Sequence, residues 1–170
     1  MAGTESGNRM NLETFVQRSY MEKILCDANR RFRDMSNGQF ELKLINVEDA
    51  GEGKNKGLDL EVLSIVTDKT RSVNTLSGGE SFMAALSLAL GMADQIQAAT
   101  AAIHLDVMFI DEGFGSLSDN ARNEAVNILK EMAGKQRQIG IISHVSELKD
   151  EIENQLIVKK DDRGSHISWR

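Results

Sequence analysis

The fold is decided by one stretch of the chain, which reads Leu105-Asp106-Val107-Met108-Phe109-Ile110-Asp111-Glu112-Gly113-Phe114-Gly115-Ser116-Leu117. Its consecutive apolar residues, 107–110, predict a strand buried on both faces, as in the centre of a parallel sheet. The strand ends in the carboxylates Asp111 and Glu112, at the edge where open α/β sheets bind ligands. In a phosphate-handling site the first carboxylate can hold Mg²⁺, and the second can orient or deprotonate a water. This acidic pair alone is equally compatible with an ordinary acidic turn.

A second stretch, Thr75-Leu76-Ser77-Gly78-Gly79-Glu80, stands directly before a long run with a helical pattern. Ser77 can cap that helix, and the two glycines let backbone N–H groups approach a ligand closely. The N-terminus of the helix also offers partial positive charge to an anion. On its own, a Ser-Gly-Gly-Glu run is only a capping signal.

A third feature is the apolar run 139–142, which predicts another buried strand and is followed by Ser143 and His144. A lone histidine is more often structural than catalytic. We expect this strand to lie beside the strand that ends in the acidic pair, so that both strands end at the ligand side of the sheet. This position favours a functional role for His144.

In this order and at this spacing, the three features resemble the signature motif, the Walker B motif and the switch histidine of an ABC-type ATPase head. The wording Asp111-Glu112-Gly113-Phe114-Gly115-Ser116-Leu117 resembles one branch closely. That branch is the SbcC type, the ATPase subunit of the SbcCD nuclease, with its archaeal and eukaryotic double-strand-break-repair relatives. ABC transporters typically show Asp-Glu-Pro at this place, and SMC proteins Asp-Glu-Val-Asp. The resemblance covers the chain from about Leu12 to Arg170.

The resemblance implies an α/β fold: the C-terminal lobe of an ABC-type P-loop ATPase head, with a mixed sheet and flanking helices. Residues 11–37 are then the helix at the base of a coiled coil, and residues 38–170 are the lobe itself. Residues 1–10 are small and polar, and we interpret them as a linker or a remnant of cloning.

The resemblance also implies what each site residue does. Two heads close face to face over two ATP molecules, and the signature loop of each head contacts the γ-phosphate of the nucleotide held by the other. That loop supplies Leu76, Ser77, Gly78, Gly79 and Glu80. Asp111 is expected to hold Mg²⁺ through water, Glu112 to polarise the hydrolytic water, and His144 to sense the γ-phosphate.

The chain departs from the family pattern in the loop after Walker B, known as the D-loop. The family usually places an aspartate directly after Gly-Ser-Leu, whereas here Ser118 fills that position and Asp119 follows. Either the loop is shifted by one residue so that Asp119 serves, or Ser118 makes the contact itself.

A phosphate-cradling loop of the Gly-x-x-x-x-Gly-Lys-Ser/Thr type does not occur in this sequence. The nearest candidate, at residues 51–57, has the wrong spacing and reads as a polar connection between strands. In SbcC-like proteins this Walker A loop lies in an N-terminal lobe beyond a long antiparallel coiled coil. We therefore expect ATP hydrolysis only when this chain is combined with that lobe, and none by the chain alone.

Length and composition place the chain among ordinary globular domains. It has 170 residues, a net charge of −6 and one cysteine, Cys26. These values do not suggest a dedicated nucleic-acid binder, and the cysteine excludes an internal disulfide framework. Local basic clusters, at residues 30–33, 54–56 and 135–137, are interpreted as solvated surface charge. With no signal peptide and no long apolar run, we expect a cytoplasmic protein with no membrane contact.

The partners that the resemblance implies are the N-terminal lobe, a second head in an ATP-dependent homodimer, an SbcD-like nuclease and double-stranded DNA ends. Two other interpretations stay open. The chain is alternatively a lobe of an SMC- or RecN-like chromosome or repair ATPase, which shares the chemistry but not the partners. It is otherwise a non-hydrolysing docking module, although an intact Glu112 and His144 argue against that.

Periodicity predicts the remaining elements. Helical spacing predicts a helix at 12–35, which ends at Ser36-Asn37-Gly38. It predicts three further helices, at 80–99, 120–133 and 145–152. The helix at 80–99 is apolar nearly all round and is expected to be buried. Alternation predicts antiparallel strands at 40–44 and 58–62, a turn at 67–70, and a closing hairpin of 155–159 with 166–169.

Overall fold

The computed structural model describes residues 12–46, 58–99, 105–133 and 137–170. The expected linker at 1–10, the connection at 51–57 and residue Lys135 lie outside these ranges. The chain contains both helices and strands, interspersed along its length, in agreement with the predicted α/β fold class. The strands form one parallel pair and two antiparallel groups, which are not hydrogen-bonded to one another in the described part of the chain.

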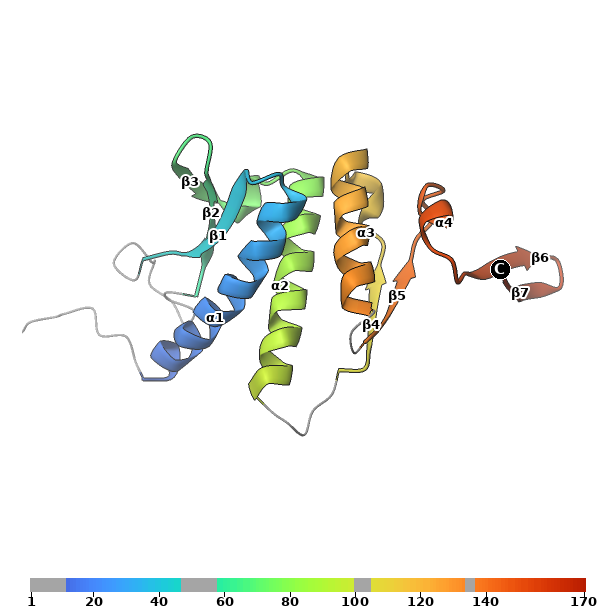
Figure 1. Cartoon of the computed structure of the whole chain (residues 1–170), viewed down its shortest axis with the longest axis horizontal. Helices are drawn as coiled ribbons and strands as arrows, with labels where there is room; N and C mark the ends of the chain where they lie inside the picture. The colour runs from blue at the N-terminus through green and yellow to red at the C-terminus, as the bar shows by residue number, and fades with distance from the viewer. Residues whose placement is uncertain (1–11, 47–57, 100–104, 134–136) are drawn as a thin grey trace, which may run out of the picture.

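Three helices lie side by side at the centre of the molecule (Figure 1): α1 (Leu12–Met35), α2 (Gly78–Ala99) and α3 (Asp119–Ala133). The buried hydrophobic residues of α1, namely Leu25, Ala28, Phe32 and Met35, all lie in its second half. The helices α1 and α2 approach closely at Gly91, where an added Cβ would lie 2.8 Å from the carbonyl oxygen of Ile24. The predicted stop of α1 is confirmed, because Asn37 and Gly38 both take positive φ angles.

A three-stranded antiparallel sheet precedes α2 in the order β1-β2-β3, formed by β1 (Phe40–Leu44), β2 (Leu60–Ser64) and β3 (Lys69–Ser72). The first two strands confirm the prediction, with minor differences at the ends. The turn predicted at 67–70 is present but lies two residues earlier, at 65–68, and β3 begins at Lys69. The sequence Lys-Thr-Arg-Ser has no apolar alternation, so pairing with β2 rather than burial makes it a strand.

The central strand β4 (Val107–Asp111) pairs in parallel with β5 (Gln138–Ile142), so the predicted neighbours are confirmed. The prediction that β4 is buried on both faces is wrong. Met108 and Ile110 pack toward the core, whereas Val107 is half exposed and Phe109 is 72% exposed. Among the described residues no layer covers this second face, which we call the outer face of β4–β5.

The sequence predicts that α2, which is apolar nearly all round, is a buried helix, and the structure buries only one side of it. Its core side includes Met83, Leu86 and Leu90, but Met92 and Ile96 are exposed. Within the described residues, α2 is the one helix long and apolar enough to cross a membrane by length and composition alone, contrary to the expectation of no such run. Because its buried side packs on α1 and on the turn after β4, that likeness is weak evidence for a membrane.

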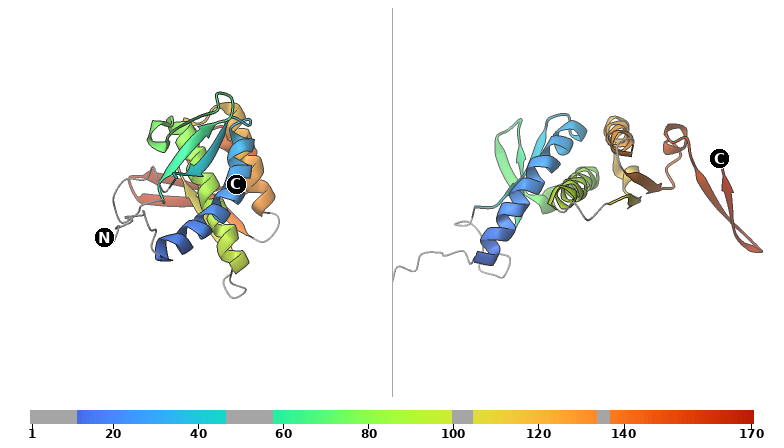
Figure 2. Two further views of the ribbon diagram at one scale, coloured as in Figure 1. Left: turned by 90° about the vertical axis from the view of Figure 1, so that its left-hand side faces the viewer. Right: turned by 60° about the horizontal axis from the view of Figure 1, so that its bottom comes forward.

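The C-terminal segment forms a short helix, α4 (Leu148–Glu151), and the predicted hairpin of β6 (Leu156–Asp161) and β7 (Gly164–Trp169). The helix is shorter than the predicted 145–152. The hairpin extends away from the helices in two views (Figures 1 and 2). One of its faces is apolar and exposed, and consists of Leu156, Val158, Ile167 and Trp169.

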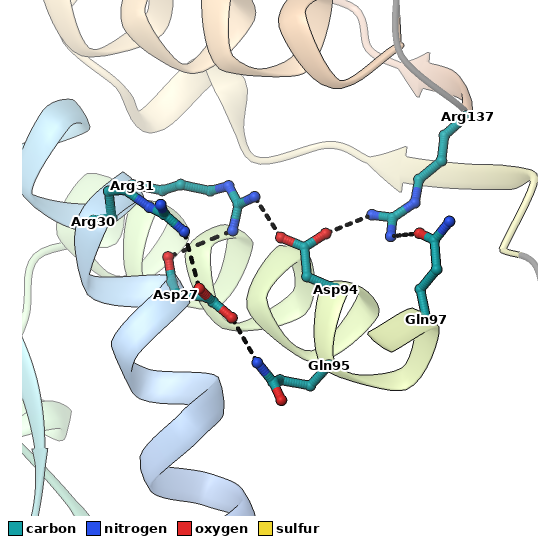
Figure 3. A network of polar contacts seen from close by, with 7 residues as sticks. All are labelled: Asp27, Arg30, Arg31, Asp94, Gln95, Gln97 and Arg137. Atoms are coloured by element: carbon teal, nitrogen blue, oxygen red, sulfur yellow. Dashed lines mark hydrogen bonds and ion pairs between the residues drawn. The ribbon is translucent and has the colours of Figure 1, made fainter. Parts of the chain in front are cut away.

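A polar network ties α1, α2 and the start of β5 together (Figure 3). Asp94 on α2 pairs with Arg31 on α1 at 2.5 Å and with Arg137 at 3.1 Å. The Arg137 guanidinium also donates to the side-chain oxygen of Gln97. Arg137 was expected to be solvated surface charge, but it is 7% exposed, because both partners lie on the helix that covers it.

Candidate functional site

The signature loop (residues 75–80) ends in a reciprocal cap at the start of α2. The Ser77 hydroxyl accepts the N–H of Glu80 at 3.3 Å, and a carboxylate oxygen of Glu80 accepts the N–H of Ser77 at 2.7 Å. This is a capping box, and the predicted cap at Ser77 is confirmed. Gly78 is exposed in the first turn, where backbone N–H groups have no partner within the helix. The loop therefore presents backbone donors and the positive end of a helix dipole to an anion.

The carboxyl group of Glu80 is held in its charged form. Partial burial by itself would raise the pKa of Glu80. The N–H and hydroxyl of Ser77 and the guanidinium of Arg71 outweigh that effect and keep the pKa below its ordinary value. Glu80 is thus an anchor of the loop rather than a proton donor near neutral pH.

The signature loop lies against the turn that follows the acidic pair. A Cβ added at Gly79 would lie 2.6 Å from the carbonyl oxygen of Ser116, so only glycine permits this approach. The Ser116 hydroxyl in turn donates to the carbonyl of Gly113 at 2.7 Å. Two regions that are far apart in the sequence therefore form one surface.

Phe82 on α2 fixes the same turn from the inside. Its ring occupies the space that a side chain at position 113 would need, and Gly113 also takes a φ of +93°. The ring packs edge-on against the fully buried Phe114, with centroids 5.0 Å apart. Sequence reasoning assigned Phe82 no role, because a phenylalanine in an apolar helix carries no signal beyond core packing.

The acidic pair lies at the C-terminal end of β4, and both carboxylates are exposed. Glu112 takes a φ of +57°, which is uncommon for a residue with a side chain and costs conformational energy. Its N–H donates to the carbonyl of Ile142 at 2.9 Å, which continues the ladder to β5. The strand pairing therefore holds the backbone of Glu112 in this turn.

His144 lies beside the acidic pair. Its Nδ1 is 2.8 Å from a carboxylate oxygen of Glu112, close enough for an N–H to donate to that oxygen. The His144 side chain is 80% exposed and that of Glu112 is 51% exposed, so both are open to a ligand or a water. The expected proximity of these two residues, drawn from strand order alone, is present.

Asp111 has the chemistry to hold a magnesium ion together with other ligands. The described residues contain no group of three or more histidine, cysteine or acidic side chains that could form a protein cage. Mg²⁺ is commonly held by one or two carboxylates plus waters and phosphate oxygens. A single exposed carboxylate at the end of β4 fits that kind of site.

The two D-loop candidates differ in their contacts. The Ser118 hydroxyl accepts the N–H of Ala121 at 3.4 Å and so caps α3. Asp119 is 88% exposed and pairs with Arg122 at 2.5 Å. Because each side chain has a local partner, the choice between Ser118 and Asp119 stays a prediction.

Solved structures of the same fold are ATPase heads. One, from work on ATP-driven dimerization and DNA-stimulated activation of SMC ATPases, matches with a TM-score of 0.70 at 18% identity, over 92% of this chain and 89% of that chain. An Smc head bound to the C-terminal winged-helix domain of ScpA also gives 0.70, at 19% identity over 93% of this chain and 45% of that chain. The chain therefore has the fold of an ABC-type ATPase head lobe.

Sequence relatives narrow the class. A family model described as SbcC/RAD50-like, Walker B motif, matches residues 58–131. The SbcC component of the nuclease SbcCD from Vibrio cholerae is 44% identical over 168 residues, and that from Treponema pallidum is 42% identical over 159 residues. These alignments cover 98% and 94% of this chain. The chain belongs to the SbcC/RAD50-like family, and it spans 16% and 15% of the length of those two relatives.

Proposed function

We propose that this chain is the C-terminal lobe of an SbcC-like DNA-repair ATPase head, active only with an N-terminal lobe that carries the Walker A loop. The observation that carries the proposal is the contact between Glu112 and His144 at 2.8 Å, together with a capped signature loop that packs on the turn after the acidic pair. A carboxylate and a histidine poised at the end of two parallel strands suit the positioning of a water for attack on a phosphate.

Each site residue then has one task. Bound Mg·ATP would supply the γ-phosphorus atom that the water attacks, and its Mg²⁺ would neutralise part of the negative charge on the phosphate oxygens. Asp111 would hold the metal, and Glu112 would orient and polarise the water. His144 would hydrogen-bond to the γ-phosphate, while Ser77 and the first-turn N–H groups would bind the nucleotide of the second head.

The exposed apolar surface supports the need for a second lobe. Parallel sheets are normally covered on both faces, but the outer face of β4–β5 exposes Val107, Phe109 and Ile142. We propose that the N-terminal lobe covers this face and extends the sheet. The first half of α1 likewise exposes Leu12, Phe15 and Tyr20, which suits the base of a coiled coil within residues 11–37. Residues 38–170 would be the lobe itself, and residues 1–10 a linker.

The wider role follows the names of the relatives. The Vibrio cholerae protein is a component of a nuclease called SbcCD. By analogy, closure of two heads over ATP and their release on hydrolysis would control an SbcD-like nuclease partner at double-stranded DNA ends in the cytoplasm.

The test uses two variants of the acidic pair in the head reconstituted from both lobes. Glu112→Gln keeps the shape and hydrogen bonds but removes the base, so turnover should fall by about 10²–10⁴-fold while ATP still binds. The heads should then accumulate as a closed dimer. Asp111→Asn should instead lose Mg²⁺-dependent binding and the dimer together.

Turnover and dimer fraction with Mg·ATP decide between these outcomes. Normal turnover by Glu112→Gln, or ATP binding by that variant without trapped dimers, would show that Glu112 is not the base.

A further inference from the structure

We propose that Arg71 is a positioning residue of the signature loop, which acts on Ser77 through Glu80 and so sets how readily two heads close over ATP. The inference rests on the proposed function, because the loop matters for closure only if it binds the nucleotide of the second head. Arg71 lies on β3, six residues before Ser77, and it belongs to none of the motifs that carry the family resemblance.

One carboxylate oxygen connects Arg71 with the loop. Oε2 of Glu80 lies 3.4 Å from Nη2 of Arg71, and the same oxygen accepts the N–H of Ser77 at 2.7 Å. The guanidinium thus stands behind the carboxylate that fixes the backbone of the signature serine. The same ion pair helps to keep the pKa of Glu80 low, in agreement with a carboxylate that is always available as an acceptor.

The other arm of the guanidinium holds the approach to the loop. Nη1 of Arg71 donates to the carbonyl oxygen of Thr75 at 2.6 Å and lies 3.0 Å from its hydroxyl. That hydroxyl donates to the carbonyl of Ser72 at 2.6 Å. Residues 72–75 are thereby closed into a tight turn that delivers the chain to Ser77 in one orientation.

Arg71 is itself fixed to the rest of the fold. On β3 it pairs with Val62 of β2, which is fully buried. Its guanidinium carbon lies 5.5 Å from the centre of the Phe40 ring, within range of a cation–π contact. About a third of the side chain is exposed, so it is neither a loose surface charge nor a buried core residue. The β1–β3 sheet therefore serves as the support of the signature loop.

The planar fork of arginine explains why this residue type is needed. It engages a carbonyl and a carboxylate at the same time, which a lysine ammonium cannot do with the same geometry. A loop that is already ordered loses less entropy when it binds a ligand. Without Arg71, Ser77 should sample more orientations, and a higher ATP concentration should be needed to close the heads.

The first measurement uses this chain alone. Amide hydrogen exchange at Ser77 should become several-fold faster in Arg71→Gln, because the acceptor of that amide is no longer braced. Lys69→Gln is the matched control, since it removes one positive charge from an exposed position of the same strand. In the control the exchange rate should not change.

The second measurement uses the head reconstituted from both lobes. Arg71→Gln should raise the ATP concentration for half-maximal dimer formation by about 10-fold, the size expected for losing one charge-assisted hydrogen bond. The maximal turnover at saturating ATP should stay within about 3-fold of the original, because the residues of the acidic pair are untouched. Arg71→Lys should recover only part of the loss. In a Glu80→Ala background, Arg71→Gln should add little, since it acts through that carboxylate.

Three results would overturn the inference: equal half-maximal ATP concentrations for Arg71→Gln and Lys69→Gln, unchanged exchange at Ser77, or fully additive effects of Arg71→Gln and Glu80→Ala. A Ser77→Arg variant of the reconstituted head distinguishes failure of this inference from failure of the proposed function, because a bulky cation at Ser77 should block ATP-dependent dimers if the loop binds the nucleotide of the second head. If the unmodified heads do not dimerise with ATP, or Ser77→Arg still does, both proposals fall.

Discussion

Phe109 and Phe114 are five residues apart, on either side of the acidic pair, and they lie in opposite surroundings. Phe114 is fully buried against Phe82, in the packed half formed by α2, α3, the second half of α1 and β1–β3. Phe109 is 72% exposed, in the open half formed by the outer face of β4–β5 and the β6–β7 hairpin. In the packed half, this chain supplies both surfaces of the hydrophobic contact, whereas in the open half it supplies only one of them.

This difference explains where the site stands. The acidic pair and His144 lie on the border between the halves, and the signature loop packs against Ser116, in the turn that follows the acidic pair. Contiguous exposed apolar surface marks an interaction site in a soluble domain. The border is therefore where a second lobe would meet residues that the packed half already holds in place.

The largest expected effect on stability separates the two phenylalanines. Phe114→Ala should lower the free energy of unfolding by about 3–5 kcal/mol, because it leaves a cavity in the packed half. Phe109→Ala should change it by no more than about 0.5 kcal/mol, because the ring is already exposed. Urea denaturation of both variants checks this, and similar losses would show that the open half is packed in solution.

A smaller effect tests the contact across the border. Gly79→Ala should destabilise the fold by about 1–3 kcal/mol, because its Cβ would lie 2.6 Å from a backbone oxygen of Ser116. Gly78→Ala is the matched control, since its Cβ would meet Ser116 at an ordinary 3.7 Å. Thermal unfolding of the pair distinguishes them, and equal stability would mean that the signature loop is not held against this turn.

The smallest effect concerns the pH dependence of the cap. The pKa of Glu80 in the folded protein lies below its ordinary value. The ionised carboxylate therefore contributes its full stabilisation of the fold above the pKa of the unfolded state, and this stabilisation is lost as the pH falls through the pKa of the folded state. Glu80→Gln should therefore cost about 1 kcal/mol at pH 7, as expected for one capping interaction. The urea midpoints of the two proteins should begin to converge as the pH falls to the unfolded pKa, about 4.3, and should meet only below the folded pKa. A gap that widens in acid would contradict the sign of this shift.

Several features of the fold and of the candidate site could be predicted from the sequence, because they depend on local sequence signals. The cap at Ser77 needs only a serine with a glutamate three residues later, and the stop of α1 needs only Asn37 and Gly38. The pairing of β4 with β5 follows from two apolar runs separated by one helix. That pairing is sufficient to bring His144 to Glu112.

The rest depends on contacts that no local pattern records. β3 is polar and is a strand only because β2 lies beside it, so Arg71 could not be placed behind the signature loop. Four apolar residues in a row predict a strand covered on both sides, but the covering layer of the outer face need not come from the same chain. Phe109 is exposed because no other described element packs on the outer face of β4–β5.

The most direct test of the central claim is the ATP turnover of the purified chain, measured alone and after addition of the Walker A-bearing N-terminal lobe. We expect no turnover by the chain alone, because the triphosphate-binding loop is absent from its sequence. In the mixture we expect turnover that Glu112→Gln removes. Turnover by the chain alone that Glu112→Gln abolishes would contradict the claim, because the open half would then need no second lobe.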